Sequence, residues 1–503
     1  MSKVQKNLLF NLVGSGWGAL MQIVFTPFYL RILGIESYGL VAFAVTLQAA
    51  LQLLDLGMSP TMNREMAKFS VTSEATNDVR DFVRTVEVGY LGLGFLMGAC
   101  IIIAAPLITT AWLKATILGP EVMERAVMII GVMIAVQWPF SLYQGGLIGL
   151  QRQGALNAVS IVSNTLLHGG VVIALLTVAP TVTVFFVCRV VVNLLQVAVT
   201  RYLLWRSLPP ANRAPRFNPG RFRKTWGFAA GMSALAFSGL ILTQTDKVLL
   251  SKLLPLADYG YYMLATTLAG GLLLLIIPVY NSIFPQLAAL VAANDEAGVC
   301  RVYHLGGQLM AVVLLPVAVT LAAYGREIVT VWTGNVSTAA VVAPILTVLT
   351  IGTALNGLMF IPYALQLAYG CTSLGIAINV VFIVLLIPSM VIMAKTAGPV
   401  AVASVWVVLN TLYTLVGVPL THRRMLPGES LKWFGDVIPA ACVCLSVAFL
   451  AKQVPVGEGV PAVLIHLALV LTVSVAGSVL VTARVRNHAL ALMKRMVPSG
   501  GRL

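Results

Sequence analysis

The chain has 503 residues, of which 59% are hydrophobic and only 10% are charged, and its formal net charge is +15. Soluble domains contain about 45–50% apolar and about 25% charged residues, so this composition excludes an ordinary soluble protein. Apolar segments recur about every 25 to 35 residues from Leu8 to Val481, which leaves no gap for a soluble catalytic domain. The sequence therefore predicts an all-α polytopic membrane protein, whose positive charge reflects membrane topology and not nucleic-acid binding.

Each spanning helix needs about 20 mostly apolar residues, and on this criterion the sequence predicts about fourteen transmembrane helices. In chain order they are 8–33, 39–60, 84–109, 122–147, 155–178, 180–205, 225–250, 259–285, 303–324, 340–365, 369–394, 396–420, 436–452 and 461–482. An even number places both termini on one side of the membrane. If that side is the cytoplasm, 23 of the 32 Lys and Arg residues are cytoplasmic, 7 lie on the opposite side, and Arg189 and Lys247 lie inside spans. This division follows the positive-inside rule.

The chain contains an internal repeat. Shifting the sequence on itself by 221 residues aligns a segment that starts at Leu33 with one that starts at Leu254. The identical pairs are Leu33 and Leu254, Tyr38 and Tyr259, Gly39 and Gly260, Thr46 and Thr267, and Leu47 and Leu268. Since six spans separate the equivalent positions, the two halves have the same orientation in the membrane. Such parallel repeats are typical of transporters whose substrate site lies between two helical bundles.

The repeat predicts the domain organisation. We expect an N-terminal six-helix lobe at 1–205, a basic cytoplasmic linker at 206–224 that is rich in Arg and Pro, and a C-terminal six-helix lobe at 225–420. Two extra helices and a basic cytoplasmic tail occupy 421–503. These two helices have almost no polar face, so a peripheral position is predicted for them.

Polar side chains recur at helical spacing in most spans of the first half. In the sixth span, Arg189, Asn193, Gln196 and Thr200 follow one another at i, i+4, i+7 and i+11 and share one face. Similar stripes are Gln48, Gln52, Asp55 and Ser59 in the second span, Gln137, Ser141 and Gln144 in the fourth, and Asn157, Asn164 and His168 in the fifth. The second half is sparser, with Asp246, Lys247, Asn356, Tyr363, Trp406, Asn410 and Tyr413. Because lipid cannot satisfy such groups, we expect them to line a wet cavity or to form hydrogen bonds between helices.

The charged residues inside spans are the strongest candidates for a functional role. A charge near the bilayer centre costs at least about 2.5 kcal/mol, so Arg189 is expected either to bind an anionic ligand or to pair with an acidic residue such as Asp246. Lys247 is a second candidate cation, although its side chain can also reach toward an interface. Asp55, Glu87 and Asp246 are candidates for ion coupling, and pairing with Arg64 or Arg84 is the simpler explanation of the first two. The six cysteines form no C-x-x-C pair, and neither a metal site nor a cofactor is predicted.

Two segments resemble a known family. Residues 7–69, which read NLLFNLVGSGWGALMQIVFTPFYLRILGIESYGLVAFAVTLQAALQLLDLGMSPTMNREMAKF, resemble the start of the polysaccharide transporter (Wzx-type) flippases. These belong to the multidrug/oligosaccharidyl-lipid/polysaccharide exporter superfamily. Residues 243–271, TQTDKVLLSKLLPLADYGYYMLATTLAGG, resemble the junction between the seventh and eighth spans of that family. The resemblance implies two six-helix lobes around a cavity that opens to one side at a time.

The resemblance also implies a function. The family moves undecaprenyl-diphosphate-linked oligosaccharides from the cytoplasmic to the periplasmic leaflet of the bacterial inner membrane, for lipopolysaccharide or exopolysaccharide biosynthesis. A diphosphate needs cations, for which Arg189 and Lys247 are candidates, and a glycan needs amides and aromatic platforms, for which the stripes with Tyr363 and Trp406 are candidates. The implied partners are the lipid bilayer, the lipid-linked glycan, a polysaccharide polymerase and chain-length proteins.

Other functions stay open at the level of sequence. A drug or organic-cation antiporter of the same superfamily would favour an acidic cavity, whereas Arg189 and Lys247 are among the deepest charges. A membrane polysaccharide polymerase or ligase would need a periplasmic reaction site, but the loops on that side are short and contain no phosphate-binding or metal-binding motif. Composition does not separate a flippase from a passive scramblase or an assembly scaffold.

Overall fold

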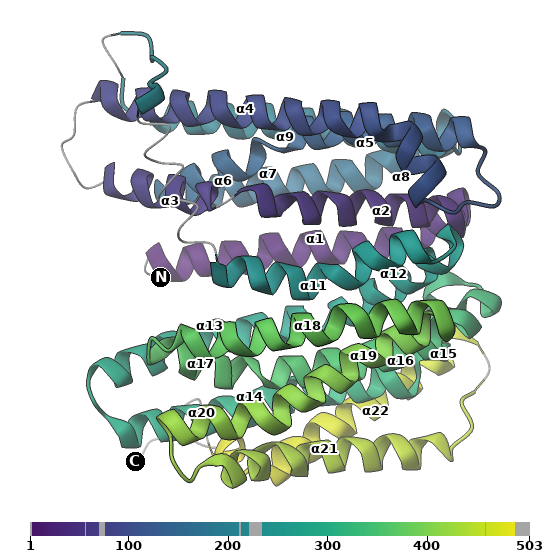
Figure 1. Ribbon diagram of the computed structural model, residues 1–503. Coiled ribbons are helices and arrows are strands. Elements are labelled where there is room, and N and C mark those ends of the chain that lie inside the picture. Colours follow the sequence, from purple (N-terminus) through teal and green to yellow (C-terminus); the bar gives the residue numbers. More distant parts are fainter. Residues whose placement is uncertain are drawn as a thin grey trace, which may run out of the picture. The chain divides into compact units, whose positions relative to one another are not determined.

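The computed structural model describes residues 3–55, 57–69, 76–210, 213–220, 234–457 and 459–487. Within these ranges all regular structure is helical (Figure 1). Eleven helical segments of the described residues are long and apolar enough to cross a membrane, and they coincide with the third to sixth and the eighth to fourteenth predicted spans. The other three predicted spans contain α1 (Lys3–Leu33), α2 (Ile35–Leu51) and α11 (Ala234–Leu253). The prediction of an all-α multi-pass membrane protein is confirmed.

The chain divides into two compact units, Met1–Gly260 and Tyr261–Leu503. Parts of the predicted linker and basic tail, namely 211–212, 221–224 and 488–503, lie outside the described residues, as do residues 225–233 of the seventh span. The described part of the linker is held against the first unit, because Arg213 forms an ion pair of 2.5 Å with Asp81 of α4.

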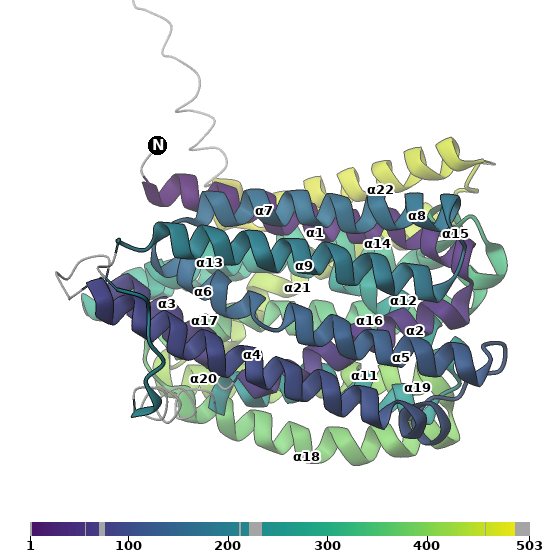
Figure 2. The same cartoon turned by 90° about the horizontal axis from the view of Figure 1, so that it is seen from above.

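The first unit is a bundle of long helices. Besides α1, α2 and α11 it contains α3 (Met58–Phe69), α4 (Thr76–Leu107), α5 (Pro120–Gln137), α6 (Phe140–Gly149), α7 (Gln153–Thr165), α8 (Val171–Thr177) and α9 (Val182–Ser207). In this bundle α4 packs on α5, α5 on α9, α1 on α7 and α3 on α6, and α4, α7 and α9 run in nearly the same direction (Figure 2).

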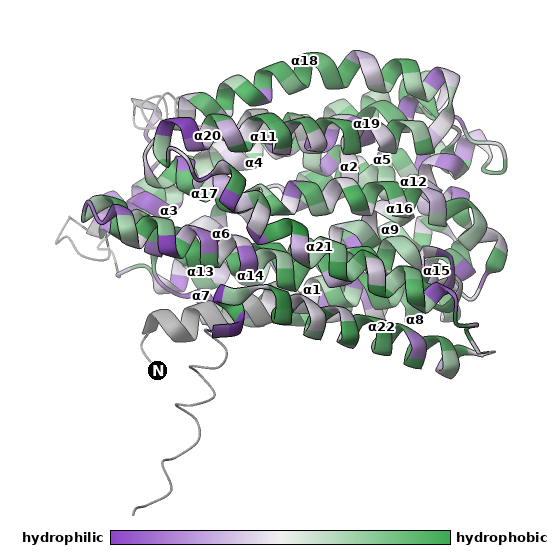
Figure 3. Ribbon diagram, turned by 90° about the horizontal axis from the view of Figure 1, so that it is seen from below, coloured by the Kyte–Doolittle hydropathy of each residue, from purple (hydrophilic) through white to green (hydrophobic). Residues whose placement is uncertain are grey.

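The second unit is built around α14 (Glu296–Ala323), which packs against α13, α16, α21 and α22. The helix α12 (Leu256–Gly270) begins in the first unit and ends in the second. The other helices of the second unit are α13 (Leu273–Ala292), α15 (Gly325–Thr333), α16 (Val336–Leu358), α17 (Phe360–Ala368), α18 (Thr372–Thr396), α19 (Gly398–Leu412), α20 (Val418–Met425), α21 (Ser430–Lys452) and α22 (Val460–Val481). Only one stripe of α22 is buried, formed by Val470, Ser474 and Ser478, as expected for a peripheral helix. The apolar surface of α18 (Figure 3), where Val380, Val381 and Val384 are exposed, is suited to contact lipid.

Several spans that the hydropathy pattern predicts as continuous are interrupted. The second predicted span, 39–60, contains the end of α2 at Leu51, a 3₁₀ turn at Gln52–Asp55 and the start of α3 at Met58. The chain changes direction at Gly57, whose φ of 77° is readily adopted only by glycine. The fourth span divides between α5 and α6 at Pro139, since proline cannot donate the backbone hydrogen bond that a continuous helix needs.

The internal repeat has a structural counterpart inside the first unit. A Cβ atom added to Gly39 would lie 2.2 Å from the carbonyl oxygen of Leu256, and one added to Gly260 would lie 2.7 Å from that of Ile35. Ile35 and Leu256 are themselves 221 residues apart, so the two contacts are equivalent and reciprocal. The repeated glycines therefore allow two equivalent backbone segments to approach closely. This symmetric contact supports the pseudo-repeat by an observation independent of the sequence alignment.

Candidate functional site

The first unit contains a cavity of about 460 Å³ between the end of α2 and the junction of α5 with α6. The residues that line it are Gln48, Gln52, Asp55, Ile134, Gln137, Trp138, Phe140, Ser141 and Gln144. The helix breaks at Gly57 and Pro139 adjoin these two lining segments. The structure thus brings the polar stripes of the second and fourth predicted spans together around one cavity.

The cavity wall combines amides, one hydroxyl, one carboxylate and aromatic rings. The Oε1 atom of Gln137 and the Nε1 atom of Trp138 are buried without a hydrogen-bond partner among the described residues. Leaving a buried polar group without a partner costs about 1–3 kcal/mol, so both side chains retain hydrogen-bonding capacity beside the cavity. Sequence periodicity identified the glutamines but missed Trp138 and Phe140, because aromatic residues beside a proline break do not stand out from core residues.

Asp55 is the one charged residue in the cavity wall. The hydroxyl of Tyr90 donates a hydrogen bond to its Oδ1 atom, and the backbone N–H of Ser59 donates to Oδ2 at 3.3 Å. The hydroxyl of Ser141 lies 3.5 Å from the same Oδ1 atom. These contacts fix the carboxylate at the cavity wall. Arg84, one of the two cations that the sequence suggested as partners of the span carboxylates, pairs with Glu87.

Arg189 lies elsewhere in the same unit, on α9, close to Tyr29 of α1 and to His168 of the π-helical turn Leu166–Gly170. Its guanidinium lies over the ring of Phe185, with 5.6 Å between the guanidinium carbon and the ring centroid. The hydroxyl of Tyr29 lies 2.9 Å from Nδ1 of the neighbouring His168. The Nε atom of Arg189 is buried and has no hydrogen-bond partner in the described residues. Arg189 is therefore a half-buried cation with donor capacity to spare.

Asp246 is not the partner of Arg189. In the described residues it forms an ion pair with the adjacent Lys247, with 3.1 Å between Nζ and Oδ1. Lys247 also donates a hydrogen bond to the carbonyl oxygen of Thr243. The alternative in which Asp246 neutralises Arg189 therefore has no support in the structure.

Glu87 is completely buried on α4 and accepts four hydrogen bonds. The donors are Arg201 Nε at 2.6 Å, the Tyr143 hydroxyl at 2.8 Å, Trp205 Nε1 at 3.2 Å and an Arg84 guanidinium nitrogen at 2.9 Å. The pairing with Arg84 that the sequence suggested is present, and Arg201 of α9 adds a second cation. Such a saturated carboxylate joins α4, α6 and α9.

The remaining amide candidates of the first unit lie between helices or on the polar face of α9. A Cβ atom on Gly14 would lie 2.2 Å from Oδ1 of Asn157, and one on Gly18 would lie 3.4 Å from Nδ2 of Asn164, so both asparagines pack against α1. On α9, Asn193 is buried and Gln196 is half-buried.

In the second unit the predicted site residues form two separate groups, one of amides with a tryptophan and one of aromatic rings. Asn356 donates to Asn410 at 2.9 Å, and Trp406 of the same helix as Asn410 covers Gly352. Tyr363 stacks on Tyr280 at 6.5 Å between ring centroids. Tyr280 in turn stacks on Phe284 at 5.7 Å. The aromatic positions thus form a half-buried platform on α13 and α17.

The helical units with their interrupted spans and polar interior define an all-α multi-pass membrane protein. Residues 4–291 match the family described as polysaccharide biosynthesis protein. The chain belongs to this family, and the resemblance noted in the sequence to its polysaccharide transporters is confirmed. A search of curated protein sequences finds no significant match.

Solved structures support the fold over nearly the whole chain. One similar structure is that of the lipid II flippase MurJ in an inward closed conformation, at a TM-score of 0.72 and 12% identity, with 94% of this chain and 98% of that chain covered. Another is an inward-facing multidrug resistance MATE family transporter of the MOP superfamily, at a TM-score of 0.57 and 15% identity, with 83% and 94% covered. A third is the MATE multidrug transporter DinF-BH, at a TM-score of 0.55 and 14% identity, with 84% and 95% covered.

Proposed function

We propose that this protein translocates undecaprenyl-diphosphate-linked oligosaccharide repeat units across the bacterial inner membrane by alternating access, for the synthesis of a cell-surface polysaccharide. The family and the fold support a lipid-linked flippase or exporter and not an enzyme. The observation that carries the finer proposal is the cavity with four glutamines, Ser141 and two aromatic residues in its wall.

The chemistry of this cavity suits a glycan. Sugar hydroxyls both donate and accept hydrogen bonds, so they can pair with the amides of the glutamines and with the Ser141 hydroxyl in the cavity wall. The apolar faces of sugar rings can pack on Trp138 and Phe140. The volume of about 460 Å³ lies within the range of about 300–1,000 Å³ that is usual for small-molecule sites.

Arg189 is proposed to bind the diphosphate. A guanidinium offers a fork of donors that matches phosphate oxygens, and its Nε atom is unpaired. The depths of the two sites along their helices differ. Arg189 is seven residues, or about 10 Å along the helix axis, from the first residue of α9. Gln52 is seventeen residues, or about 25 Å, from the first residue of α2. Both helices begin at the same, non-cytoplasmic end in the proposed topology. Arg189 would then receive the diphosphate late in translocation, after the glycan has left the deeper cavity.

The remaining candidate residues take supporting roles in this proposal. Further polar contacts for the substrate are proposed at Asn157, Asn164, Asn193, Gln196, Lys247, Asn356, Tyr363, Trp406 and Asn410. Asp55 is the most suitable carboxylate for ion coupling because it faces the cavity, whereas Glu87 and Asp246 are engaged in ion pairs. Both termini are proposed to be cytoplasmic, and a polysaccharide polymerase and chain-length proteins are the proposed partners.

The test is a cellular export assay with the double variant Gln52→Leu/Gln137→Leu. Removing two amides should cost two or more hydrogen bonds of about 1 kcal/mol each, so export should fall by about tenfold or more. Lipid-linked oligosaccharide should then accumulate in the cytoplasmic leaflet. Gln453→Leu, at an exposed glutamine beyond α21, is the matched control and should export normally. Undiminished export by the double variant at equal protein level would refute the role of the cavity.

A drug or organic-cation antiporter is the second candidate. The observation in its favour is that Asp55, an acidic residue, is the only charged group in the cavity wall. On that hypothesis Asp55→Asn would abolish export of a cationic dye, while Gln52→Leu/Gln137→Leu would leave dye export largely intact. Glycan export that depends on the glutamines, without export of the dye, decides against the antiporter.

A further inference from the structure

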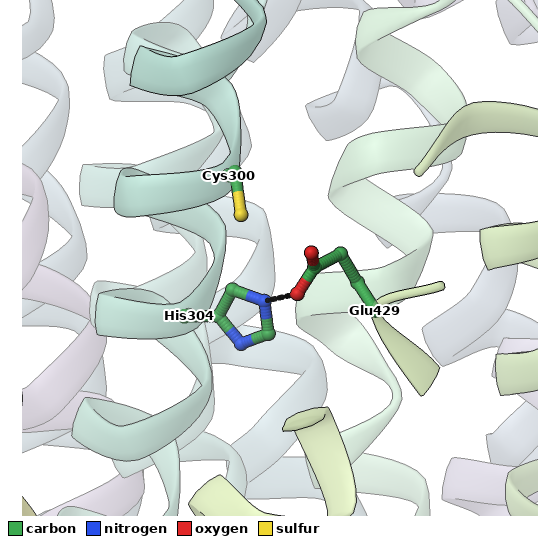
Figure 4. A group of neighbouring side chains, drawn as sticks. All are labelled: Cys300, His304 and Glu429. Carbon is green, nitrogen blue, oxygen red and sulfur yellow. Dashed lines mark hydrogen bonds and ion pairs between the residues drawn. The ribbon is translucent and has the colours of Figure 1, made fainter. Parts of the chain in front are cut away.

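A thiol, an imidazole and a carboxylate meet in the second unit, in a group of residues that the proposed transport function does not use. Cys300 and His304 are separated by four residues on α14 and therefore share one face of that helix. Glu429 approaches them from the segment between α20 and α21 (Figure 4). One ligand atom of each residue lies within 4.8 Å of the other two.

The neighbours of His304 orient its ring. Its Nδ1 atom forms a hydrogen bond with Asp436 of α21, and the other carboxylate oxygen of Asp436 accepts from Gln308 Nε2 at 2.6 Å. A carboxylate at Nδ1 favours the tautomer that has its proton there and leaves the Nε2 lone pair free. Metal-binding histidines are commonly held in this way by a second carboxylate.

The free side of the ring then faces another acceptor. His304 Nε2 lies 3.0 Å from Glu429 Oε2, and His304 is completely buried. A neutral ring with its proton on Nδ1 has no proton to donate to Glu429. A cation between the two groups resolves this conflict.

We propose that Cys300, His304 and Glu429 bind a Zn²⁺ ion through Sγ, Nε2 and a carboxylate oxygen. Sulfur, nitrogen and oxygen donors in one site favour zinc among the common metals. With zinc bonds of about 2.0–2.1 Å to nitrogen and oxygen, the two atoms are about 3.3 Å apart in a tetrahedral shell, so the observed 3.0 Å needs only a small adjustment. A water molecule would complete the coordination.

The orientation of the Glu429 carboxylate suits a metal ligand. The Lys432 ammonium donates a hydrogen bond of 2.8 Å to the Glu429 carboxylate. Lys432 contacts Oε1, which leaves Oε2 directed at His304.

The metal would fasten the two extra helices to the rest of the second unit. Glu429 immediately precedes α21, and Asp436 lies near the start of that helix. Gln308 Oε1 accepts the backbone N–H of Arg484 at 2.9 Å, just after α22. The network therefore connects α14 with α21 and with the segment that follows α22. The zinc is proposed to stabilise this arrangement and to take no part in substrate binding.

The experiment is a titration of the purified full-length protein in detergent with Co²⁺, followed by displacement with Zn²⁺. The wild type should bind one equivalent and show the near-ultraviolet charge-transfer absorption of a cobalt thiolate. Cys300→Ser should lose this absorption and weaken binding by at least about tenfold, while the hydrogen bonds of His304 with Asp436 and Glu429 are retained. Cys442→Ser, at an exposed cysteine on α21, is the matched control and should behave as the wild type.

Two results would overturn the proposal. The first is a wild type that binds no Co²⁺ or Zn²⁺ at stoichiometric concentration. The second is cobalt binding without thiolate absorption, or with absorption that survives in Cys300→Ser. Either outcome leaves the proposed glycan transport untouched, because no residue of this group lines the cavity.

Discussion

Replacing Glu87 with glutamine tests whether this carboxylate is a structural centre of the first unit. Glu87 is completely buried and contacts two arginines, one on its own helix and one on α9. The variant Glu87→Gln keeps the size of the side chain but removes its charge. It also replaces one acceptor oxygen by an NH₂ group, which would face the donor of either Arg84 or Arg201.

The expected cost follows from the burial of the partners. Breaking a fully buried ion pair costs about 3–5 kcal/mol. Here the side chains of Arg84 and Arg201 are 40% and 47% exposed, so water can replace part of the lost interaction. We therefore expect Glu87→Gln to lower the free energy of unfolding by about 2–3 kcal/mol.

The assay is reversible unfolding in detergent, with Glu65→Gln as the matched control. Glu65 forms a single ion pair of 2.9 Å with Lys68 on the surface of α3, and its loss should change the free energy of unfolding by less than about 0.5 kcal/mol. If Glu87→Gln is as stable as the control, the hypothesis that Glu87 stabilises the first unit is wrong. Loss of ion-dependent transport in a variant of unchanged stability would then assign Glu87 to coupling.

Three further predictions concern packing, the anion site and topology. Gly39→Ala should destabilise the protein by about 1–3 kcal/mol, because the new methyl group would collide with the Leu256 carbonyl. At Gly92 an added methyl group meets nothing within 4 Å, so Gly92→Ala should stabilise the protein by up to about 1 kcal/mol. Thermal unfolding of the two variants measures both effects, and equal stabilities would contradict the packing prediction. Arg189→Ala should fold and insert but export no glycan, and Arg189→Lys should recover only part of the export rate, since a point charge replaces a fork of donors; normal export by the alanine variant would remove Arg189 from the site. Reporter fusions after residues 215 and 490 should both report a cytoplasmic location, and a periplasmic signal from either would contradict the topology.

The sequence predicted the membrane spans well because hydropathy measures a property that each helix has by itself. Among the described residues, all eleven helical segments long and apolar enough to cross a membrane lie at predicted spans. The breaks at Gly57 and Pro139 were not predicted, since a short polar or proline-containing step does not lower the mean hydropathy of a span. The stripes containing Gln52 and Gln137 were identified by spacing, and they meet at the cavity.

The partners of the polar residues were harder to predict. Helical periodicity identifies a polar face but does not say which helix it will meet. Asn157 therefore had the same sequence signal as Gln52, although it packs against Gly14 of α1. The group at His304 shows the same difficulty, because its contact with Glu429 joins residues 125 positions apart. No metal site was predicted there from the sequence.

The most direct test of the central claim is translocation of a lipid-linked glycan by the purified protein in liposomes. Undecaprenyl-diphosphate-linked oligosaccharide is placed in one leaflet, and its appearance in the other is followed with a membrane-impermeant glycan-modifying enzyme. We predict translocation by the wild type, and a rate at least about tenfold lower for Gln52→Leu/Gln137→Leu. A wild-type rate no higher than that of protein-free liposomes, or equal rates for the wild type and the double variant, would contradict the account.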